Sequence, residues 1–379
     1  MENKELYNSI RKQMLKSEEA LNKYATKSED AIRLKKEKKD IRLDFARDID
    51  RIIHTSSYTR YIDKTQVYSN IKNDNVSRRM THVQFVSRAS KTIARALGLN
   101  EDLCEAISLG HDVGHVPFGH YGERLLNNIS KRRTGKCFAH NINSVRVFKD
   151  VEKCGEGCNL TLQVLDGIMC HNGEFVQKEY APIKKSKEDF LKEYDMCFED
   201  ESKIKKLIPM TLEGCVVRIS DIIGYIGKDI DDAKKLNLFD TSMIPDKIKT
   251  ILGTKNVEIM NNIITDVIIN SFGKEYIQMS DEVYEQVCNL KAFNYEYIYN
   301  KAMSKNRKEK IEYMFNMLYE YYIDIIKKEE RDNDIYTVFL NDMNEEYLNK
   351  STIDEKVIDY ISSMTDNFFE RQFKKYIRN

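Results

Sequence analysis

Residues 111–123 read His-Asp-Val-Gly-His-Val-Pro-Phe-Gly-His-Tyr-Gly-Glu, and they concentrate side chains that bind metals and transfer protons. The preceding segment, 101–110, has the apolar spacing of a helix, and Asn100 is a good N-cap for it. His111 and Asp112 therefore lie at the end of an apolar helix, where both can face one ion. A neutral imidazole and a carboxylate are ligands for Mn, Fe, Mg or Zn. Two adjacent residues cannot complete a coordination shell, so further ligands must come from elsewhere.

Two other residues are candidates for completing this shell. His82 begins a predicted helix over 82–98, and Asp221 lies within a predicted helix over 212–235. The neighbours of Asp221 are apolar, and an unpaired carboxylate is costly to bury among them. Four protein ligands leave positions open for water and a phosphate oxygen, which a catalytic metal requires.

Composition and periodicity predict an all-α protein. The 379 residues include only 4 prolines and 15 glycines, where averages of about 5% and 7% are usual. Helices fit residues 82–98, 101–110, 120–129, 140–152, 160–171 and 212–235. Residues 177–209 read as an insertion or loop with a short helix. The expected organisation is a helical arm over 1–50, a core over 51–240 and a C-terminal helical region over 241–379 that packs on the core.

The histidines and the positive charges overlap. All seven histidines lie between residues 54 and 171, and such a cluster suits metal and proton chemistry. The net charge is zero, but residues 51–100 carry nine Lys and Arg against two Asp. A solvated basic face is the ordinary interpretation of such a block. Its overlap with the histidines favours a site for an anionic substrate.

Several other classes of protein are disfavoured. No run approaches the ~20 apolar residues of a membrane span, and the first twenty residues carry charges throughout instead of the apolar core of a signal peptide. The 8 cysteines are sparse for a disulfide scaffold and are expected to be reduced thiols in a cytoplasmic protein. The Lys-rich patch at 35–39 leaves contact with nucleic acid open.

Several ordered blocks carry a resemblance to a known family. The set of His82, His111-Asp112 and Asp221 resembles the HD phosphohydrolase superfamily, and the surrounding residues resemble its deoxynucleoside triphosphate triphosphohydrolase (dGTPase-like) branch. The supporting stretches are 50–56 (DRIIHTS), 64–67 (KTQV), 79–82 (RMTH), 138–141 (FAHN), 221–225 (DIIGY) and 229–232 (DIDD). The resemblance covers roughly 45–235. It implies an HD-domain core in which water attacks the α-phosphorus of a dNTP, releasing a deoxynucleoside and intact triphosphate.

The resemblance implies roles for individual residues. His120 and Glu123, which share one helical face, match a catalytic pair, with His120 as proton donor or transition-state contact and Glu123 as the partner that orients water or the histidine. His140 matches a histidine that supports this pair, and His115 matches one in the phosphate pocket. Contacts to the phosphates and the sugar are implied for Arg79, Gln66, Tyr225 and Asp229. The implied metal ligands are His82, His111, Asp112 and Asp221.

The resemblance also implies partners. A divalent metal ion is expected, with Mn or Mg favoured for activity and Fe or Zn as further options, and a dNTP is expected as substrate. A homo-oligomer and a nucleotide activator follow at the level of the family. His171 is balanced between a site residue and a structural one, whereas His54 reads as structural.

Two alternative functions stay open at this point. Another HD-type phosphohydrolase, such as a 5′-deoxynucleotidase or a phosphodiesterase, would use the same metal set without a role for a triphosphate-sized site. A nucleotide-sensing or nucleic-acid-binding protein with reduced catalysis would retain the site in a vestigial form. The complete set of metal and acid–base groups favours an enzyme over the second alternative.

Overall fold

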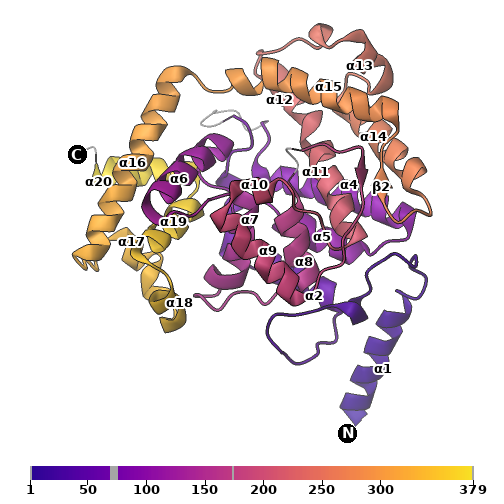
Figure 1. Cartoon of the computed structure of the whole chain (residues 1–379), viewed down its shortest axis with the longest axis horizontal. Coiled ribbons are helices and arrows are strands. Elements are labelled where there is room, and N and C mark those ends of the chain that lie inside the picture. Colours follow the sequence, from indigo (N-terminus) through magenta and orange to yellow (C-terminus); the bar gives the residue numbers. More distant parts are fainter. Residues whose placement is uncertain (1, 69–75, 173–174, 378–379) are drawn as a thin grey trace.

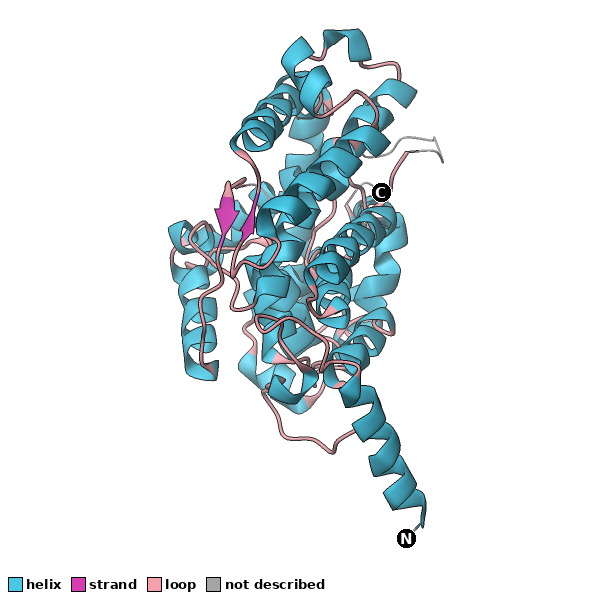
Figure 2. Ribbon diagram, turned by 90° about the vertical axis from the view of Figure 1, so that its right-hand side faces the viewer, coloured by secondary structure: helices cyan, strands magenta, loops and turns pink. Residues whose placement is uncertain are grey.

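The protein is built from helices, as a computed structural model that describes residues 2–68, 76–172 and 175–377 shows. Its strands in this part of the chain are one short antiparallel pair, β1 (Glu179–Tyr180) and β2 (Ile277–Gln278) (Figure 2). The all-α prediction is therefore confirmed. The α-helices, in chain order, are α1 (Glu2–Lys16), α2 (Asp44–Ile53), α3 (Ser56–Thr59), α4 (Arg79–Leu97), α5 (Glu101–Gly110), α6 (Gly119–Thr134), α7 (His140–Arg146), α8 (Leu162–Cys170), α9 (Lys187–Glu199), α10 (Glu201–Ile204), α11 (Leu212–Ile226), α12 (Lys228–Lys235), α13 (Asp246–Ile251), α14 (Asn256–Ser271), α15 (Asp281–Tyr297), α16 (Lys305–Lys327), α17 (Asp334–Thr337), α18 (Glu345–Lys350), α19 (Ile353–Ser363) and α20 (Asp366–Tyr376).

The centre of the molecule is a group of apolar helices that pack on one another (Figure 1). Helix α4 packs on α5, and α11 packs on α4, α5 and α8. The predicted boundaries of α4 and α5 are confirmed to within a few residues. Gly98 ends α4 with a φ of 69°, a left-handed conformation that glycine adopts at little cost. Asn100 then caps α5 by accepting hydrogen bonds from the amides of Asp102 and Leu103.

Two predicted helices differ from the observed ones. The expected helix over 212–235 is divided at Gly227 into α11 and α12, at one of the three glycines of that stretch, the residue type with the lowest helix propensity there. The expected helix over 140–152 contains α7 followed by a π-helical turn, Val147–Val151. The segment 177–209 contains β1, α9 and α10 rather than a single short helix.

The chain beyond α12 contributes to two separate apolar clusters. Helices α14 and α15 bury Ile259, Ile263 and Leu290 in the cluster that also contains α4, α5 and α11. Helices α16, α19 and α20 form a second cluster with α6 (Figure 1). The regularly spaced residues of α16 that face this cluster are Ile311, Phe315, Leu318, Tyr322 and Ile325. The first cluster contains residues from both sides of position 240. The division of the chain into three regions stays a prediction.

The expected helical arm over 1–50 is wrong in its middle part. Helix α1 points away from the body (Figures 1 and 2), and α2 begins only at Asp44. The residues between them form turns, a short 3₁₀ helix at Ser28–Asp30 and extended backbone. Few apolar residues recur at helical spacing in this stretch, so a helix there would have little apolar surface to bury.

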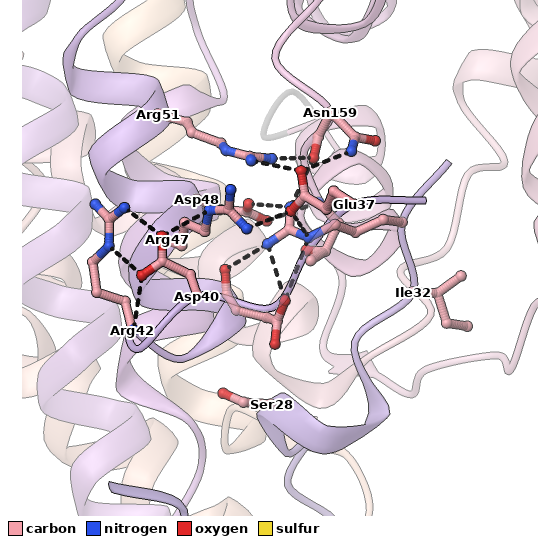
Figure 3. Close-up of polar contacts among 12 residues, drawn as sticks. Ser28, Ile32, Glu37, Asp40, Arg42, Arg47, Asp48, Arg51 and Asn159 are labelled. Carbon is pink, nitrogen blue, oxygen red and sulfur yellow. Dashed lines mark hydrogen bonds and ion pairs between the residues drawn. The ribbon is translucent and has the colours of Figure 1, made fainter. Parts of the chain in front are cut away.

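Ion pairs hold this extended segment against the body (Figure 3). The Arg33 guanidinium lies 2.7 Å from Asp48 Oδ1 and donates to the carbonyl oxygen of Asn159 at 2.7 Å. Asp48 is fully buried, and its second oxygen accepts from the amide of Thr161 at 2.7 Å. Burial raises the pKa of Asp48, against the charge of Arg33. Asp48 thus fixes both Arg33 and the strand-like residues before α8.

Replacing Asp48 by Asn is expected to lower the free energy of unfolding by about 3 kcal/mol, because it removes the closest of the three carboxylates that pair with the half-buried Arg33. Chemical denaturation monitored by circular dichroism measures the change. Asp40→Asn is the control, since Asp40 pairs with the exposed Arg42 and such a pair contributes less than about 1 kcal/mol. Equal effects of the two substitutions would contradict the assigned role of Asp48.

Within the described residues, none of the helices combines the length and the apolar character that crossing a membrane would require.

Candidate active site

The packing of three helices brings the four predicted metal ligands together. His82 lies in the first turn of α4, His111 and Asp112 follow α5, and Asp221 lies on α11. His82 Nε2 is 3.0 Å from Asp221 Oδ1 and 3.8 Å from Asp112 Oδ2. His111 Nε2 is 3.5 Å from Asp112 Oδ1 and 3.7 Å from Asp221 Oδ1. All four side chains are buried, so their donor atoms face one enclosed point.

The protonation states of these side chains suit the binding of a cation. His111 Nδ1 donates to the carbonyl oxygen of Ser108 at 2.7 Å, which leaves the lone pair on Nε2, and this buried nitrogen has no hydrogen-bond partner among the described residues. Burial lowers the pKa of His111. Burial would raise the pKa of Asp112, but His111 and Arg79 outweigh it and hold the pKa well below its usual range.

The residues present fit a divalent metal ion. Burial opposes ionisation of Asp221 as well, but the hydrogen bond with His82 and the neighbouring His111 lower its pKa to about 2. Two ionised carboxylates and two imidazoles form a mixed oxygen and nitrogen set, which transition-metal ions such as Mn, Fe and Zn accept. The partnerless Nε2 of His111 is a donor atom that such an ion would satisfy.

A second group of predicted residues lies beside the first. Glu123 on α6 contacts two histidines: Oε2 is 3.1 Å from His120 Nδ1 and Oε1 is 2.9 Å from His140 Nδ1. Burial would raise the pKa of Glu123, but His140 and the hydrogen bond with His120 hold it well below its usual range. The His120 side chain is 57% exposed, so it lies at the open side of this group.

His115 connects the two groups. Its Nε2 is 3.2 Å from Asp112 Oδ1, and its ring stacks on that of His140 with 3.9 Å between centroids. Burial, followed by the charge of Arg79, lowers the pKa of His115 well below its usual value. A neutral ring therefore spans the space between the Asp112 carboxylate and the group of Glu123, His120 and His140.

The residues with implied contacts to phosphate and sugar follow or contact the predicted metal ligands and their neighbours. Arg79 is 2% exposed; its Nη1 pairs with Asp112 Oδ2, and Nη2 donates to the carbonyl oxygen of Thr65 at 3.1 Å. In this structure Arg79 thus binds a predicted metal ligand, whereas the resemblance implies that it binds phosphate. Gln66 follows Thr65, and its Oε1 is buried without a partner among the described residues. Tyr225 is half-buried, one turn beyond Asp221 on α11.

Asp229 has a partner that the sequence did not indicate. It lies on α12, is buried, and accepts a hydrogen bond from the Tyr299 hydroxyl at 2.8 Å. Tyr299 comes from the 3₁₀ helix Tyr299–Lys301 after α15, far from the histidine window. Burial raises the pKa of Asp229 to about 7, so this carboxyl exchanges its proton near neutral pH.

The raised pKa of Asp229 predicts a pH-dependent loss of stability. Below pH 3.8, its ordinary pKa, the group is protonated in the folded and the unfolded chain. As the pH rises toward 7, the unfolded chain loses this proton first, so folding becomes less favourable. Asn cannot ionise, and Asp229→Asn should therefore gain about 4 kcal/mol relative to the wild type between pH 4 and pH 7.5. Denaturant titrations at both pH values measure it; parallel pH profiles would contradict the assignment.

Two further residues fix the loop that follows Asp112. The buried Lys64 donates to the carbonyl oxygen of Val113 at 3.2 Å and also to that of His115. Asp366, at the start of α20, accepts from the amide of Phe118 at 3.1 Å and from the hydroxyl of Thr65. Each of these contacts joins residues that are distant in sequence, so no local sequence motif predicts them.

The two histidines outside the implied sets lie in different environments. His171 is 1% exposed, and its Nε2 is 3.7 Å from Asp112 Oδ1, so the structure places it at the centre. Burial, followed by His111 and His140, lowers the pKa of His171 to about 3. His54 is exposed at the end of α2, with Nδ1 2.7 Å from the carbonyl oxygen of Asp50, which agrees with the structural interpretation.

Comparisons with known proteins agree with this geometry. The HD-domain model matches residues 79–224, which contain all four predicted metal ligands, and the model of the phosphohydrolase-associated domain matches residues 277–375. A deoxyguanosinetriphosphate triphosphohydrolase-like protein of Caldanaerobacter subterraneus is 37% identical over 362 residues, which cover 94% of this chain and 91% of the relative.

Two more relatives have the same description. The one from Clostridium tetani is 34% identical and the one from Desulfatibacillum aliphaticivorans is 33% identical. The aligned residues cover 90% and 88% of this chain, respectively, and 88% of each relative. This chain is therefore an HD-domain phosphohydrolase and belongs to the family of deoxyguanosinetriphosphate triphosphohydrolase-like proteins.

Proposed function

We propose that this protein hydrolyses deoxynucleoside triphosphates to deoxynucleoside and inorganic triphosphate. The observation that carries the proposal is the contact between two groups of side chains. The donor set around Asp112 lies against the Glu123 pair, with His115 3.2 Å from Asp112 Oδ1 and stacked on His140. The proposed site for a divalent ion and the proposed site for proton transfer are thus adjacent, as metal-assisted hydrolysis of a phosphate ester would use them. The printed descriptions of the relatives support the same substrate class.

The metal ligands in this proposal are His82, His111, Asp112 and Asp221. When bound, the ion supplies charge stabilisation at phosphate and a more acidic water. Glu123 holds the rings of His120 and His140 through Nδ1. In this proposal the exposed His120 gives a proton to the departing 5′-oxygen. Gln66, Arg79, Tyr225 and Asp229 are proposed to contact the phosphates and the sugar.

Product analysis tests the proposal. The purified protein is incubated with each dNTP and Mn²⁺ or Mg²⁺, and the products are separated by ion-exchange chromatography. Deoxynucleoside together with inorganic tripolyphosphate is the expected result. Release of orthophosphate from a deoxynucleoside monophosphate would favour a 5′-deoxynucleotidase instead. Tight binding of dNTPs without turnover, across metals and added nucleotides, would favour a nucleotide-sensing protein.

Other inferences from the resemblance stay predictions. They are the base preference for dGTP, the choice of Mn or Mg, assembly into a homo-oligomer, activation by a nucleotide and a cytoplasmic location. The same assay addresses two of them, because it compares bases and metals under one set of conditions.

A further inference from the structure

Helix α19 is linked to both of the helices that carry Glu123 and His140. It packs on α6, which carries Glu123 (Figure 1). Its acidic side chains also form ion pairs with basic residues of α6, of the loop that follows α6, and of α7. These pairs are Arg133 with Asp354, Lys136 with Glu355 and Arg146 with Asp359, at 3.1, 2.7 and 2.8 Å. The C-terminal region thus holds both partners of the hydrogen bond between Glu123 and His140.

The three ion pairs differ in burial. The pair of Lys136 is open to solvent, since the lysine side chain is 53% exposed, and such pairs contribute little. The Asp359 side chain is only 2% exposed. Its two oxygens accept from Nε and from Nη2 of Arg146, each at 2.8 Å. A bidentate pair of this kind fixes the orientation of the guanidinium as well as its distance.

A further donor holds the Asp359 carboxylate in place. The hydroxyl of Tyr347, a buried residue of α18, donates to Oδ2 at 2.8 Å. The carboxylate therefore accepts three hydrogen bonds in a buried environment, where an unmade hydrogen bond is costly. Asp359 is a fixed point of the C-terminal region, and Arg146 takes its position from it.

Helix α7 transmits the position of Arg146 to His140. His140 is its first residue and Arg146 its last, so the two are separated by about 9 Å of regular helix. Between them, Ser144 Oγ donates to the carbonyl oxygen of His111 at 2.6 Å. A tilt of α7 about this contact moves the two ends of the helix in opposite directions. The anchor at Arg146 therefore determines where His140 lies.

The contacts of His140 depend closely on its position. Its Nδ1 is 2.9 Å from Glu123 Oε1, and the same oxygen accepts from the backbone amide of His140 at 2.7 Å. The His140 ring stacks on that of His115 with 3.9 Å between centroids. A shift of about 1 Å takes these hydrogen bonds out of their normal range. Misplacements of this size at an active site cost about a hundredfold in rate.

We propose that Asp359 is a positioning residue, which holds α7 through Arg146 and thereby sets the geometry of the hydrogen bond between Glu123 and His140. Its effect on turnover rests on the proposed function, whereas the geometry can be measured without substrate. Arg146 lies within the matched HD domain and Asp359 within the phosphohydrolase-associated domain. In this arrangement the associated domain contributes no reacting group through Asp359 and still determines the rate.

Steady-state kinetics measure the effect on turnover. Asp359→Asn keeps the size of the side chain and replaces one accepting oxygen by an amide group that cannot accept from Arg146. Its kcat for dNTP hydrolysis should fall about a hundredfold, whereas KM and bound metal per chain should stay within about twofold of the wild type. Arg146→Lys keeps the charge and loses the bidentate geometry. It should lower kcat less, again with an unchanged KM.

Two control variants separate positioning from stability, with all rates measured well below the unfolding temperature. Asp48→Asn also removes a buried carboxylate from an arginine, Arg33, and should destabilise the protein without lowering kcat. Lys136→Met removes the exposed pair from the same helix and should retain kcat. A decrease for Asp359→Asn no larger than for Asp48→Asn would overturn the inference. If Asp359→Asn does not fold, Arg146→Lys decides the same comparison.

NMR of the histidine side chains measures the geometry itself. Glu123 as a carboxylate only accepts hydrogen bonds, so His140 Nδ1 carries a proton. This N–H should give a downfield signal that is identified by its loss in His140→Asn. The signal should shift or broaden in Asp359→Asn and stay unchanged in Asp48→Asn. An unchanged signal in Asp359→Asn would overturn the inference whatever the kinetics. Since the spectra need no substrate, a wild type without dNTP turnover removes the proposed function while the spectra still decide the role of Asp359.

Discussion

Asp112→Ala should lose bound metal and hydrolytic activity together. The carboxylate oxygens of Asp112 lie 3.5 Å from His111 Nε2, 3.8 Å from His82 Nε2 and 3.7 Å from His171 Nε2, so this side chain approaches two of the other predicted ligands. A bound ion supplies several kcal/mol of charge stabilisation to a phosphoryl transition state. Its loss therefore corresponds to a decrease of about a thousandfold or more in kcat/KM. The substitution also leaves the buried Arg79 without its carboxylate.

The measurement combines metal analysis with steady-state kinetics on the same preparation. Asp63→Ala is the control, because Asp63 is an exposed aspartate in the neighbouring 3₁₀ helix Arg60–Asp63 and should retain both metal and rate. Thermal unfolding shows whether Asp112→Ala is folded. Near-wild-type activity in folded Asp112→Ala would contradict the assignment of the ligand set.

Gly114→Ala should destabilise the protein at the candidate active site. A Cβ at Gly114 would overlap the carbonyl oxygen of His140 and the amide nitrogen of Ser144, and it would lie 2.7 Å from the carbonyl carbon of Asn143. All three atoms belong to the backbone of α7, so no side-chain rotation relieves the overlap. The Gly114 amide also donates to Ser144 Oγ at 2.9 Å. Steric overlap and a lost hydrogen bond together predict destabilisation of at least about 3 kcal/mol.

The same change should displace His140, because α7 has to move away from the loop that carries Asp112 and His115. Gly135→Ala is the matched control. A Cβ at Gly135 meets nothing within 4 Å, but the φ of 72° makes alanine cost about 1 kcal/mol. Chemical denaturation gives both values, and metal content should fall only in Gly114→Ala. Equal destabilisation of the two variants would contradict the close packing assigned to Gly114.

Most of the candidate site can be proposed from the sequence because the predicted metal ligands lie in local patterns. His111 and Asp112 end an apolar helix, His82 starts another, and Asp221 is a carboxylate among apolar neighbours. Each pattern is visible within one or two turns. His171 had a local signal of the same kind, since it ends the apolar helix α8 as His111 ends α5. The local pattern alone does not show that His171 lies in the site, because its distance to Asp112 depends on how α8 packs.

Other contacts have no local signal. Tyr299 reaches Asp229 across 70 residues, and Asp366 reaches Phe118 across 248, so only the packing of distant helices brings them together. In the N-terminal region the sequence instead suggests a helix that the structure does not contain. Its charge density suggests an exposed helix, but the charges of Arg33, Glu37 and Asp48 pair with one another and with the chain near Asn159. Periodicity describes surfaces that helices bury and does not describe a segment held by ion pairs.

The contacts of Asp366 have a consequence for folding during translation. This carboxylate in α20 holds the amide of Phe118 and the hydroxyl of Thr65, and the carbonyl oxygen of Ser362 accepts from Lys64 at 3.4 Å. A ribosome synthesises both loop segments long before it synthesises the residues that fix them. A nascent chain can therefore bury its first apolar cluster and still lack a fixed catalytic loop. We therefore expect activity only after α20 has been synthesised, and a premature stop codon shortly before residue 366 should yield a chain that retains its first apolar cluster and lacks activity.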